Sequence, residues 1–196
     1  FIELFKSILS VSDTPTMYKD SDEFWSNFPI FIAGLTEKTA ELAGEVADGL
    51  MPYLASTAHL QKLINSAKIG REKSSLNTVF CMTAGLPSFI SEDEDKAVEA
   101  AIKGLSGYAR LPFYQRVLSL SGYEEIIKKI QDGENPAEVL TAELVKDVAL
   151  VGSISSCKDT LNRFIDAGAD MPIITPNAVG KQSPLEVMQN IIDVIS

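Results

Sequence analysis

The sequence contains few of the side chains on which common catalytic and metal sites depend. There is one histidine, His59, among 196 residues, so neither a Ser-His-Asp triad nor a histidine-rich metal site is expected within this chain. The two cysteines, Cys81 and Cys157, are too few for a disulfide framework and have no Cys-x-x-Cys spacing. Both lie in apolar segments, so we interpret them as reduced core residues of a cytoplasmic protein.

Basic side chains are also in the minority. Seventeen Lys and Arg stand against 27 Asp and Glu, a net charge of −10, which argues against a nucleic-acid or anionic-membrane partner. The apolar runs are far shorter than the roughly 20 residues of a membrane span, and no signal-peptide pattern opens the chain. No glycine-rich nucleotide fingerprint occurs either. The charge balance fits a soluble protein.

What the sequence does contain is a series of short apolar runs separated by amphipathic segments, and residues 28–54 show it most clearly. Residues 28–33 predict a buried strand, Gly34 a tight turn, and Thr36 the N-cap of a helix. Residues 50–54 predict the next strand, which must run parallel to the first because a helix joins them. The buried stripe of this helix is predicted to be Thr39, Leu42, Ala43, Val46 and Ala47.

Two further strands are predicted, at residues 76–84 and 171–175, with residues 148–151 ambiguous between strand and helix end. Gly85 to Pro87 is predicted as a loop, and residues 68–75 as a polar connection. A capping box of Ser91 and Glu94 is predicted to open the next helix. The remaining helices are predicted at residues 1–10, 58–67, 108–118, 123–131 and 136–146, from Ser153 to a C′ residue at Gly168, and from Ser183 onward.

Several packing expectations accompany these elements. Residues 12–26 should form a surface loop, with Trp25 and Phe28 packing at its end. Asn135 and Pro136 should begin the helix at 136–146 as N-cap and first residue. The terminal helix should direct one stripe inward: Leu185, Met188, Ile191, Ile192 and Ile195.

Buried strands that alternate with helices predict an α/β fold with a parallel sheet. Four strands fit either an open doubly wound sheet or half of an eight-stranded barrel, which needs about 250 residues in full. The chain begins at Phe1, within a helical pattern and without a methionine. We therefore expect a fragment that corresponds to half a barrel, with a helical insertion at residues 107–147 before the last strand.

The chemical signals are confined to a few positions. The turn at residues 34–39 opens a helix at the carboxyl end of a strand, where amides, hydroxyls and Lys38 suit a phosphate group. His59 follows the second strand and is interpreted as a surface residue at a helix start, with ligand contact as the alternative. The acidic residues 92–95 are interpreted as a helix N-terminus rather than a paired-carboxylate site. No metal site is expected.

Two segments resemble a known family. Residues 32–49, IAGLTEKTAELAGEVADG, resemble the A-x-L-G-P-K-M-x-E-L-A-G-E-I-A-D-G block of the bacterial luciferase-like monooxygenases. Residues 151–153, VGS, with residues 167–170, AGAD, resemble the later V-G-T/S … A-G-x-D segment of that family. The match covers nearly the whole chain in order.

The resemblance implies a (β/α)8 TIM-type barrel enzyme that uses FMN or the deazaflavin coenzyme F420 and acts on a small-molecule substrate. This chain would hold strands five to eight, the C-terminal half. The turn after the fifth strand approaches the cofactor in this family, and position by position this implies cofactor contacts from Gly34, Leu35, Thr36, Lys38 and Thr39. The chain departs from the family at Thr36-Glu37, where Gly-Pro is common. No catalytic residue can be assigned, because most substrate and ring contacts would lie in the N-terminal half.

The expected function is hydride transfer through the flavin, and the overall character of residues 41–49 favours the F420-dependent branch similar to methylenetetrahydromethanopterin reductase. A non-catalytic α/β fragment that binds a partner is the alternative. A third, weaker alternative is another phosphate-binding barrel, such as an aldolase or isomerase. An open half-barrel would expose two sheet edges, so we expect a homodimer or pairing with the missing N-terminal half.

Overall fold

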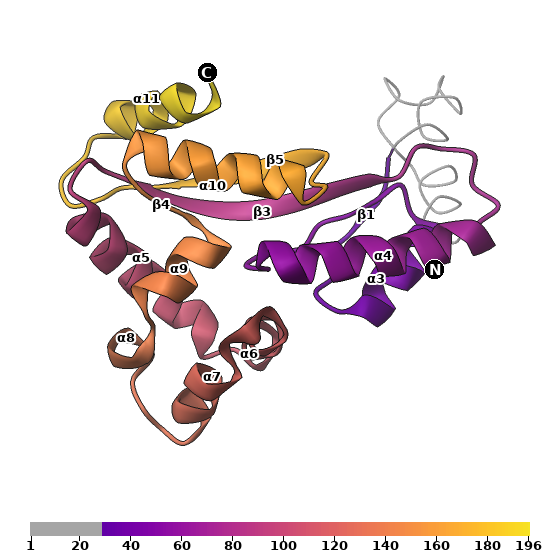
Figure 1. The fold of residues 1–196 in the computed structure, drawn as a ribbon, viewed down its shortest axis with the longest axis horizontal. Coiled ribbons are helices and arrows are strands. Elements are labelled where there is room, and N and C mark those ends of the chain that lie inside the picture. Colours follow the sequence, from indigo (N-terminus) through magenta and orange to yellow (C-terminus); the bar gives the residue numbers. More distant parts are fainter. Residues whose placement is uncertain (1–28) are drawn as a thin grey trace, which may run out of the picture.

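The fold is built on a parallel sheet in which one long strand contacts three others (Figure 1). The computed structural model describes residues 29–196. The predictions for residues 1–10 and 12–26, for Trp25 and for Phe28 lie outside this part of the chain. Its strands are β1 (Phe31–Ile32), β2 (Gly49–Leu50), β3 (Cys81–Ile90), β4 (Leu150–Gly152) and β5 (Met171–Asn177). All of their pairings are parallel, as predicted.

Strand β3 has different neighbours along its two edges. Gly85 pairs with Tyr53, just beyond β2, on one edge and with Ile173 of β5 on the other. Nearer its carboxyl end, β3 pairs with β4 through Ser88 to Ile90. Among the described residues, β1 pairs only with β2, and β5 pairs only with β3. Each therefore has one edge without a strand neighbour in this part of the chain.

The helices lie between and after these strands. They are α3 (Glu37–Val46), α4 (Thr57–Lys73), α5 (Glu94–Ala109), α6 (Pro112–Leu118), the π-helical turn η2 (Ser119–Tyr123), α7 (Glu124–Gln131), α8 (Pro136–Val139), α9 (Ala142–Val148), α10 (Ile154–Asp166) and α11 (Pro184–Ile195). The chain from α5 to α9, which we call the helical excursion, lies together on one side of the molecule (Figure 1). That residues 107–147 form an insertion in a larger domain stays a prediction.

Local capping signals predicted several helix ends correctly. Thr36, Asn135, Ser153 and Ser183 are the N-caps of α3, α8, α10 and α11, and each accepts a hydrogen bond from a first-turn amide. Gly168 follows α10 with φ 105°, a conformation that favours glycine. The capping box at Ser91 and Glu94 is wrong. Asp93 caps α5 instead, and Ser91 accepts a bond from the Asp93 amide at 3.1 Å.

The third strand begins at Cys81 rather than at residue 76, and it runs further than predicted, through Gly85 and Pro87, so the loop assigned there is wrong. The amide of Gly85 donates to Pro52 O at 2.8 Å, so alternate residues of β3 direct their nitrogens to this edge. Pro87 lies between the last pairing with the β2 segment and the first with β4. Its lack of an N–H therefore leaves no ladder bond unmade. The ambiguous residues 148–151 divide into the end of α9 and the start of β4.

Helix α4 extends to Lys73, so the predicted connection at residues 68–75 is largely helical. The cause is its packing on α3. A Cβ at Gly70 would lie 1.8 Å from Glu41 O, and one at Gly44 would lie 2.0 Å from Ala67 O. Because the two backbones approach this closely, α3 buries Ala40, Ala43 and Gly44, and Leu42 is 50% exposed rather than buried.

Three other helix predictions are corrected. Residues 108–118 divide at Arg110, where α5 ends before α6, and residues 136–146 divide into α8 and α9. In α11 the inward stripe is Val187, Ile191 and Val194. The predicted inward residues Leu185, Met188, Ile192 and Ile195 are instead 48–78% exposed.

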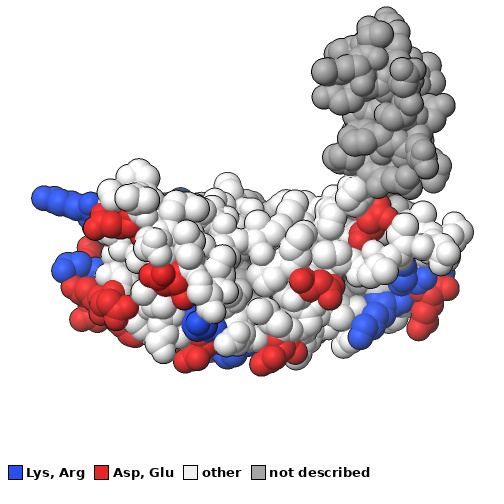
Figure 2. All heavy atoms as spheres, turned by 90° about the horizontal axis from the view of Figure 1, so that it is seen from above, with Lys and Arg blue, Asp and Glu red and all other residues white. Residues whose placement is uncertain are grey.

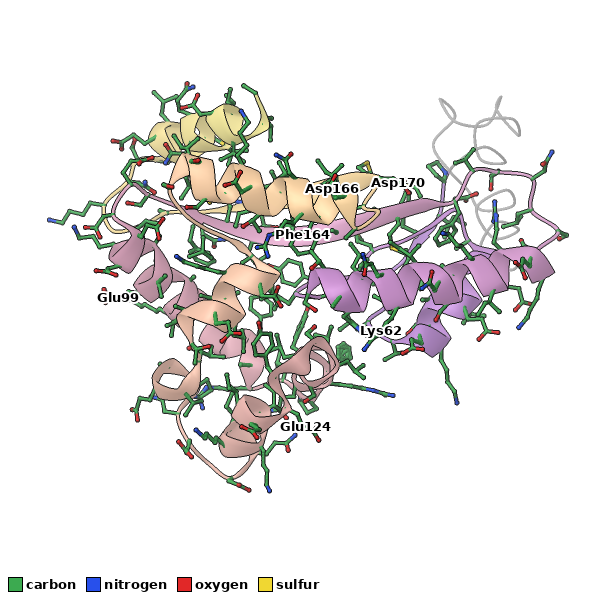
Figure 3. All side chains as sticks on the ribbon, in the orientation of Figure 1. Lys62, Glu99, Glu124, Phe164, Asp166 and Asp170 are labelled. Carbon is green, nitrogen blue, oxygen red and sulfur yellow. The ribbon has the colours of Figure 1, made fainter. Side chains whose placement is uncertain are left out.

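The core has two parts, one on each face of the sheet. The outer face of β3 carries Met82, Ala84, Leu86 and Ile90, and it packs against α3, α4, α10 and α11. Phe164 of α10 lies in this layer, toward α4 (Figure 3). The inner face carries the alternate residues Thr83, Gly85, Pro87 and Phe89. Phe89 packs into the second core with the helical excursion.

Candidate functional site

The candidate site lies at the carboxyl ends of the parallel strands, the end at which α/β folds bind ligands. Three segments meet there: the turn after β1, the segment after β2, and the helical excursion. Leu35 from the first, Tyr53 from the second, and Tyr108 and Tyr114 from the third all pack against one apolar cluster. Residues far apart in the sequence are thus brought to one place.

The turn after β1 is compact. A Cβ at Gly34 would lie 2.9 Å from Leu50 Cδ1 and 3.0 Å from Thr39 Cβ, so a side chain at this position would push the turn away from β2. Thr36 Oγ1 accepts from the Thr39 amide at 3.3 Å, and the two threonine hydroxyls lie 2.6 Å apart. These two bonds fix the first turn of α3 at the end of β1.

The donors at this turn fit an anion. The amide of Ala40 makes the bond to Thr36 O that begins the helix ladder, so the amides of Glu37 and Lys38 precede that ladder. The helix dipole, these amides, the hydroxyls of Thr36 and Thr39 and the exposed Lys38 ammonium all favour a phosphate group. The carboxylate of Glu37, which opposes an anion, is exposed. The predicted residues Gly34, Leu35, Thr36, Lys38 and Thr39 therefore lie in one turn with suitable chemistry.

A cluster of three tyrosines, which we call the tyrosine cluster, lies on the inner face beside this turn. The ring centroids of Tyr53, Tyr108 and Tyr114 are 5.0–6.1 Å apart. The Tyr53 ring lies across Gly85, where a Cβ would be 2.6 Å from Tyr53 Cδ2. Burial raises the pKa of Tyr53, and Tyr108 raises it further, while Thr175 on β5 acts in the opposite direction. Burial also raises the pKa of Tyr114, so the hydroxyls of Tyr53 and Tyr114 stay protonated at neutral pH and are hydrogen-bond donors.

Sequence analysis missed the tyrosine cluster. Tyr53 lies on the segment after β2, whereas Tyr108 and Tyr114 lie on two helices of the excursion. No spacing pattern connects them, because the excursion folds back over the inner face only in the tertiary structure.

His59 is not the surface residue that was predicted. Its side chain is fully buried at the start of α4, and Nε2 lies 2.9 Å from Leu35 O. The segment that precedes it is strained at Leu54, a buried residue with φ 59°. Left-handed backbone costs a non-glycine residue about 1–2 kcal/mol, and such residues concentrate at functional sites.

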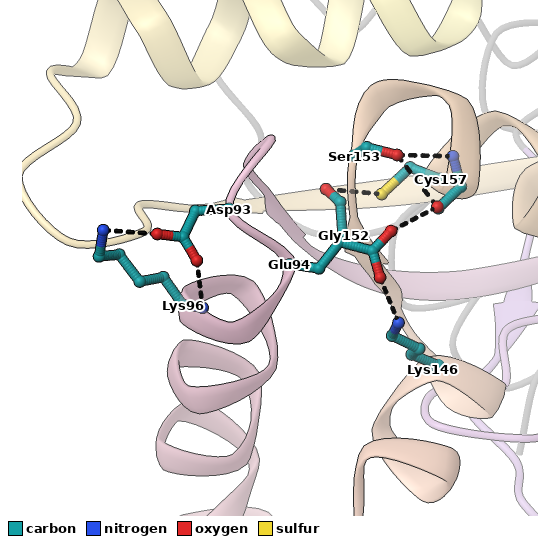
Figure 4. A network of polar contacts seen from close by, with 8 residues as sticks. Asp93, Glu94, Lys96, Lys146, Gly152, Ser153 and Cys157 are labelled. Atoms are coloured by element: carbon teal, nitrogen blue, oxygen red, sulfur yellow. Dashed lines mark hydrogen bonds and ion pairs between the residues drawn. The ribbon is translucent and has the colours of Figure 1, made fainter.

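The acidic residues 92–95 form a helix N-terminus, as predicted. Two of them, Glu92 and Glu94, also bond to the start of α10 (Figure 4 shows Glu94). Glu94 accepts from Lys146 Nζ at 2.8 Å and from Ser156 Oγ at 2.9 Å, and Glu92 accepts from the Ile154 amide at 3.4 Å. Lys146 and Ser156 lower the pKa of Glu94. A second anion site at the start of α10 is therefore disfavoured, because carboxylates already lie there.

The model of the luciferase-like monooxygenase family matches residues 7–171. The chain belongs to this family. The site in the turn after β1 thus occurs in a chain whose relatives are oxidoreductases and monooxygenases.

Individual relatives agree with the family assignment. A Mycobacterium tuberculosis protein described as a coenzyme F420-dependent oxidoreductase is 26% identical over an alignment of 169 residues, and the match covers 76% of this chain and 48% of that protein. The chain therefore spans about half the length of this curated relative.

Two solved structures show the same fold. The F420-dependent tetrahydromethanopterin reductase of Methanopyrus kandleri matches with a TM-score of 0.61 at 16% identity, over 83% of this chain and 49% of the reductase. An F420-dependent secondary alcohol dehydrogenase matches with a TM-score of 0.62 at 20% identity, over 97% of this chain and 58% of the dehydrogenase. The α/β fold with a parallel sheet is thus that of the family.

One further cavity lies away from the candidate site. It has a volume of about 360 Å³ and is lined by residues that include Arg71, Phe80, Met82 and Asp170. Met82 and Asp170 lie at the amino ends of β3 and β5, opposite the end at which this fold binds ligands.

No helix in the described part of the chain is long and apolar enough to cross a bilayer.

Proposed function

We propose that the turn at Gly34 to Thr39 binds the phosphate-bearing tail of a flavin-type cofactor, in an oxidoreductase that transfers a hydride through that cofactor. The observation that carries this proposal is the donor set of the turn, in a chain of the luciferase-like monooxygenase family. When bound, the cofactor ring supplies the centre that accepts or donates the hydride.

The residues of this chain would bind the cofactor and orient it. Lys38 and the first-turn amides would hold the phosphate, and Gly34 would let the backbone approach it closely. The hydroxyls of Thr36 and Thr39, which bond to each other at 2.6 Å, can turn one hydrogen outward to an anion. The tyrosine cluster would cover the neighbouring inner face and exclude water from it.

We favour coenzyme F420 over FMN. The M. tuberculosis relative and both solved structures described above are F420-dependent according to their descriptions. The exposed position of Lys38 also suits a tail that continues beyond one phosphate. Both cofactors share the phosphate that this turn would bind, so direct comparison of the two is required.

Titration of the chain with F420, and separately with FMN, tests the proposal by cofactor fluorescence. Lys38→Ala should weaken binding by about tenfold, because it removes one charge-assisted hydrogen bond. Lys158→Ala, which removes an exposed lysine from α10, is the matched control and should bind as the wild type does. The proposed site would be rejected if the wild type bound neither cofactor, or if the Lys38→Ala and Lys158→Ala variants bound equally well.

We also propose that the chain forms half of a (β/α)8 barrel that a second half-barrel, or a second copy, completes. The unpaired edges of β1 and β5 within the described residues support this, because open edges recruit further strands. The exposed stripe of α11, with Leu185 78% and Ile195 60% exposed, supports it as well. Figure 2 shows a wide surface without charge between scattered acidic groups on the side of α10 and α11.

Size-exclusion chromatography with light scattering tests this assembly. The chain should be at least dimeric, and Ile192→Lys should shift it toward the monomer. A wild type that stays monomeric at high micromolar concentration would contradict pairing between copies and leave a separate half-barrel as the partner to be added. A monomer that binds F420 without any partner would favour a binding module over a barrel enzyme.

A further inference from the structure

The buried His59 side chain makes one polar contact and lacks another. Nε2 lies 2.9 Å from Leu35 O, in the candidate turn. Nδ1 is buried and has no hydrogen-bond partner among residues 29–196. A carbonyl oxygen only accepts, so Nε2 carries the hydrogen and Nδ1 is an acceptor without a donor. An apolar side chain of similar size would avoid this unsatisfied nitrogen. The histidine ring therefore contributes its bond to Leu35 rather than favourable burial.

His59 also lies in a series of bonds that crosses the candidate site. Its amide donates to Ser56 Oγ at 3.2 Å, which caps α4. The Ser56 amide in turn donates to Ser121 Oγ at 3.1 Å, in the π-helical turn η2 of the excursion. Ser121 precedes Gly122, whose φ is 104°. Three segments, the turn after β1, the start of α4 and the excursion, are thus connected through His59 and Ser56.

In the described part of the chain, the other hydrogen bonds of residues 34–39 are local to the start of α3. Thr36 and Thr39 bond to each other and to the first turn of α3, and these bonds set the local shape of the helix start. The Leu35 carbonyl is the group that bonds outward to α4. Loss of the His59 donor would therefore free the turn to move relative to the inner face without unfolding α3.

We propose that His59 is a positioning residue, which fixes the turn at Gly34 to Thr39 through the Leu35 carbonyl and so presents the first-turn amides to the cofactor phosphate. The effect of His59 on cofactor affinity rests on the proposed function. Its effect on the conformation of the turn does not depend on that function. His59 itself touches no ligand, because it is fully buried behind Leu35.

Two substitutions separate the donor from the bulk of the side chain. His59→Gln retains an N–H donor near the position of Nε2, whereas His59→Met has similar volume and no donor. Hydrogen exchange of the Glu37 to Ala40 amides should accelerate at least threefold in His59→Met and stay near the wild-type rate in His59→Gln. Ser66→Ala, a buried polar residue further along α4, is the control and should leave the exchange unchanged.

Cofactor titration and urea unfolding complete the test. His59→Met should weaken F420 or FMN binding by about tenfold, the effect of one hydrogen bond, with a urea midpoint close to that of the wild type. His59→Gln should restore affinity to within about threefold of the wild type. If His59 had a purely structural role, both His59→Met and His59→Gln would lower the urea midpoint. The amides of the turn would then exchange faster only as far as global unfolding became more frequent.

The outcomes distinguish this inference from the proposed function. A wild type that binds neither cofactor rejects the proposed function, and the exchange rates then decide the conformational part alone. A wild type that binds, together with a His59→Met variant of equal affinity and equal exchange, rejects the positioning role. Faster exchange and weaker binding in His59→Met, both reversed in His59→Gln, support it.

Discussion

The contact between α3 and α4 makes a strong prediction for Gly70→Ala. The added Cβ would lie 1.8 Å from the carbonyl oxygen of Glu41, whereas real Cβ contacts essentially never fall below 3.0 Å. The atoms must therefore separate by at least about 1.2 Å, the difference between these two distances. Both atoms belong to helix backbones or are fixed to them, so no side chain can rotate to relieve the clash.

The expected cost follows from two opposing terms. Overpacking of a tight contact costs about 1–3 kcal/mol, and this contact belongs at the upper limit because backbone must move. Alanine is about 1 kcal/mol better than glycine within a helix. The free energy of unfolding should therefore fall by about 2 kcal/mol, which in a chain of this size lowers Tm by about 4–8 °C.

Urea unfolding followed by circular dichroism measures this change. Gly107→Ala is the matched control, because it replaces a helical glycine around which nothing lies within 4 Å of the new Cβ. The control should be as stable as the wild type or more stable by up to about 1 kcal/mol. If Gly70→Ala were as stable as Gly107→Ala, the close approach of α3 and α4 would be refuted.

Three further predictions follow from perturbed pKa values. Burial raises the pKa of the Cys157 thiol to about 12, so iodoacetamide at pH 8 should modify Cys157 only after urea unfolds the protein; prompt modification in the native state would contradict its burial. Because burial raises the pKa of Tyr53 above its ordinary value of 10.0, the native state holds this proton more tightly than the unfolded state, and stability should fall as pH rises above about 10. Tyr53→Phe should reduce that fall, as measured by urea midpoints at pH 8 and 10.5, and an unchanged fall would assign it to other groups. Burial also raises the pKa of Asp147 above its ordinary value of 3.8, so the stability that its protonated form contributes is lost as pH rises through that raised pKa. Asp147→Asn should therefore have a higher urea midpoint than the wild type at pH 7, whereas a lower midpoint would show that the carboxylate is needed.

Local signals were sufficient where a helix end depends on its own neighbours. Thr36, Ser153 and Ser183 accept bonds from amides three residues away, and Gly168 adopts the positive φ that a helix end favours. The candidate turn could be predicted for the same reason, since all of its donors come from six consecutive residues. These features need no partner from elsewhere in the chain.

Local signals failed where the outcome depended on a distant neighbour. Gly85 and Pro87 are turn formers in isolation, yet β3 continues through them because Tyr53 packs across Gly85 and no partner requires an N–H from Pro87. Leu42 fits the buried stripe of α3 by periodicity. It is exposed because Gly44 and Gly70 bring α4 against a different side of the helix.

The sequence by itself determined the parallel α/β class, the positions of most helix starts, and the anion-suited turn after β1, because each depends on periodicity or on bonds between near neighbours. The resemblance carried by residues 32–49 determined the family. Only the tertiary structure decided that His59 is buried against Leu35, that Tyr53 meets Tyr108 and Tyr114, and that the stripe of α11 faces outward. These features depend on which surfaces of distant elements meet, and a single sequence does not encode that choice in any local pattern.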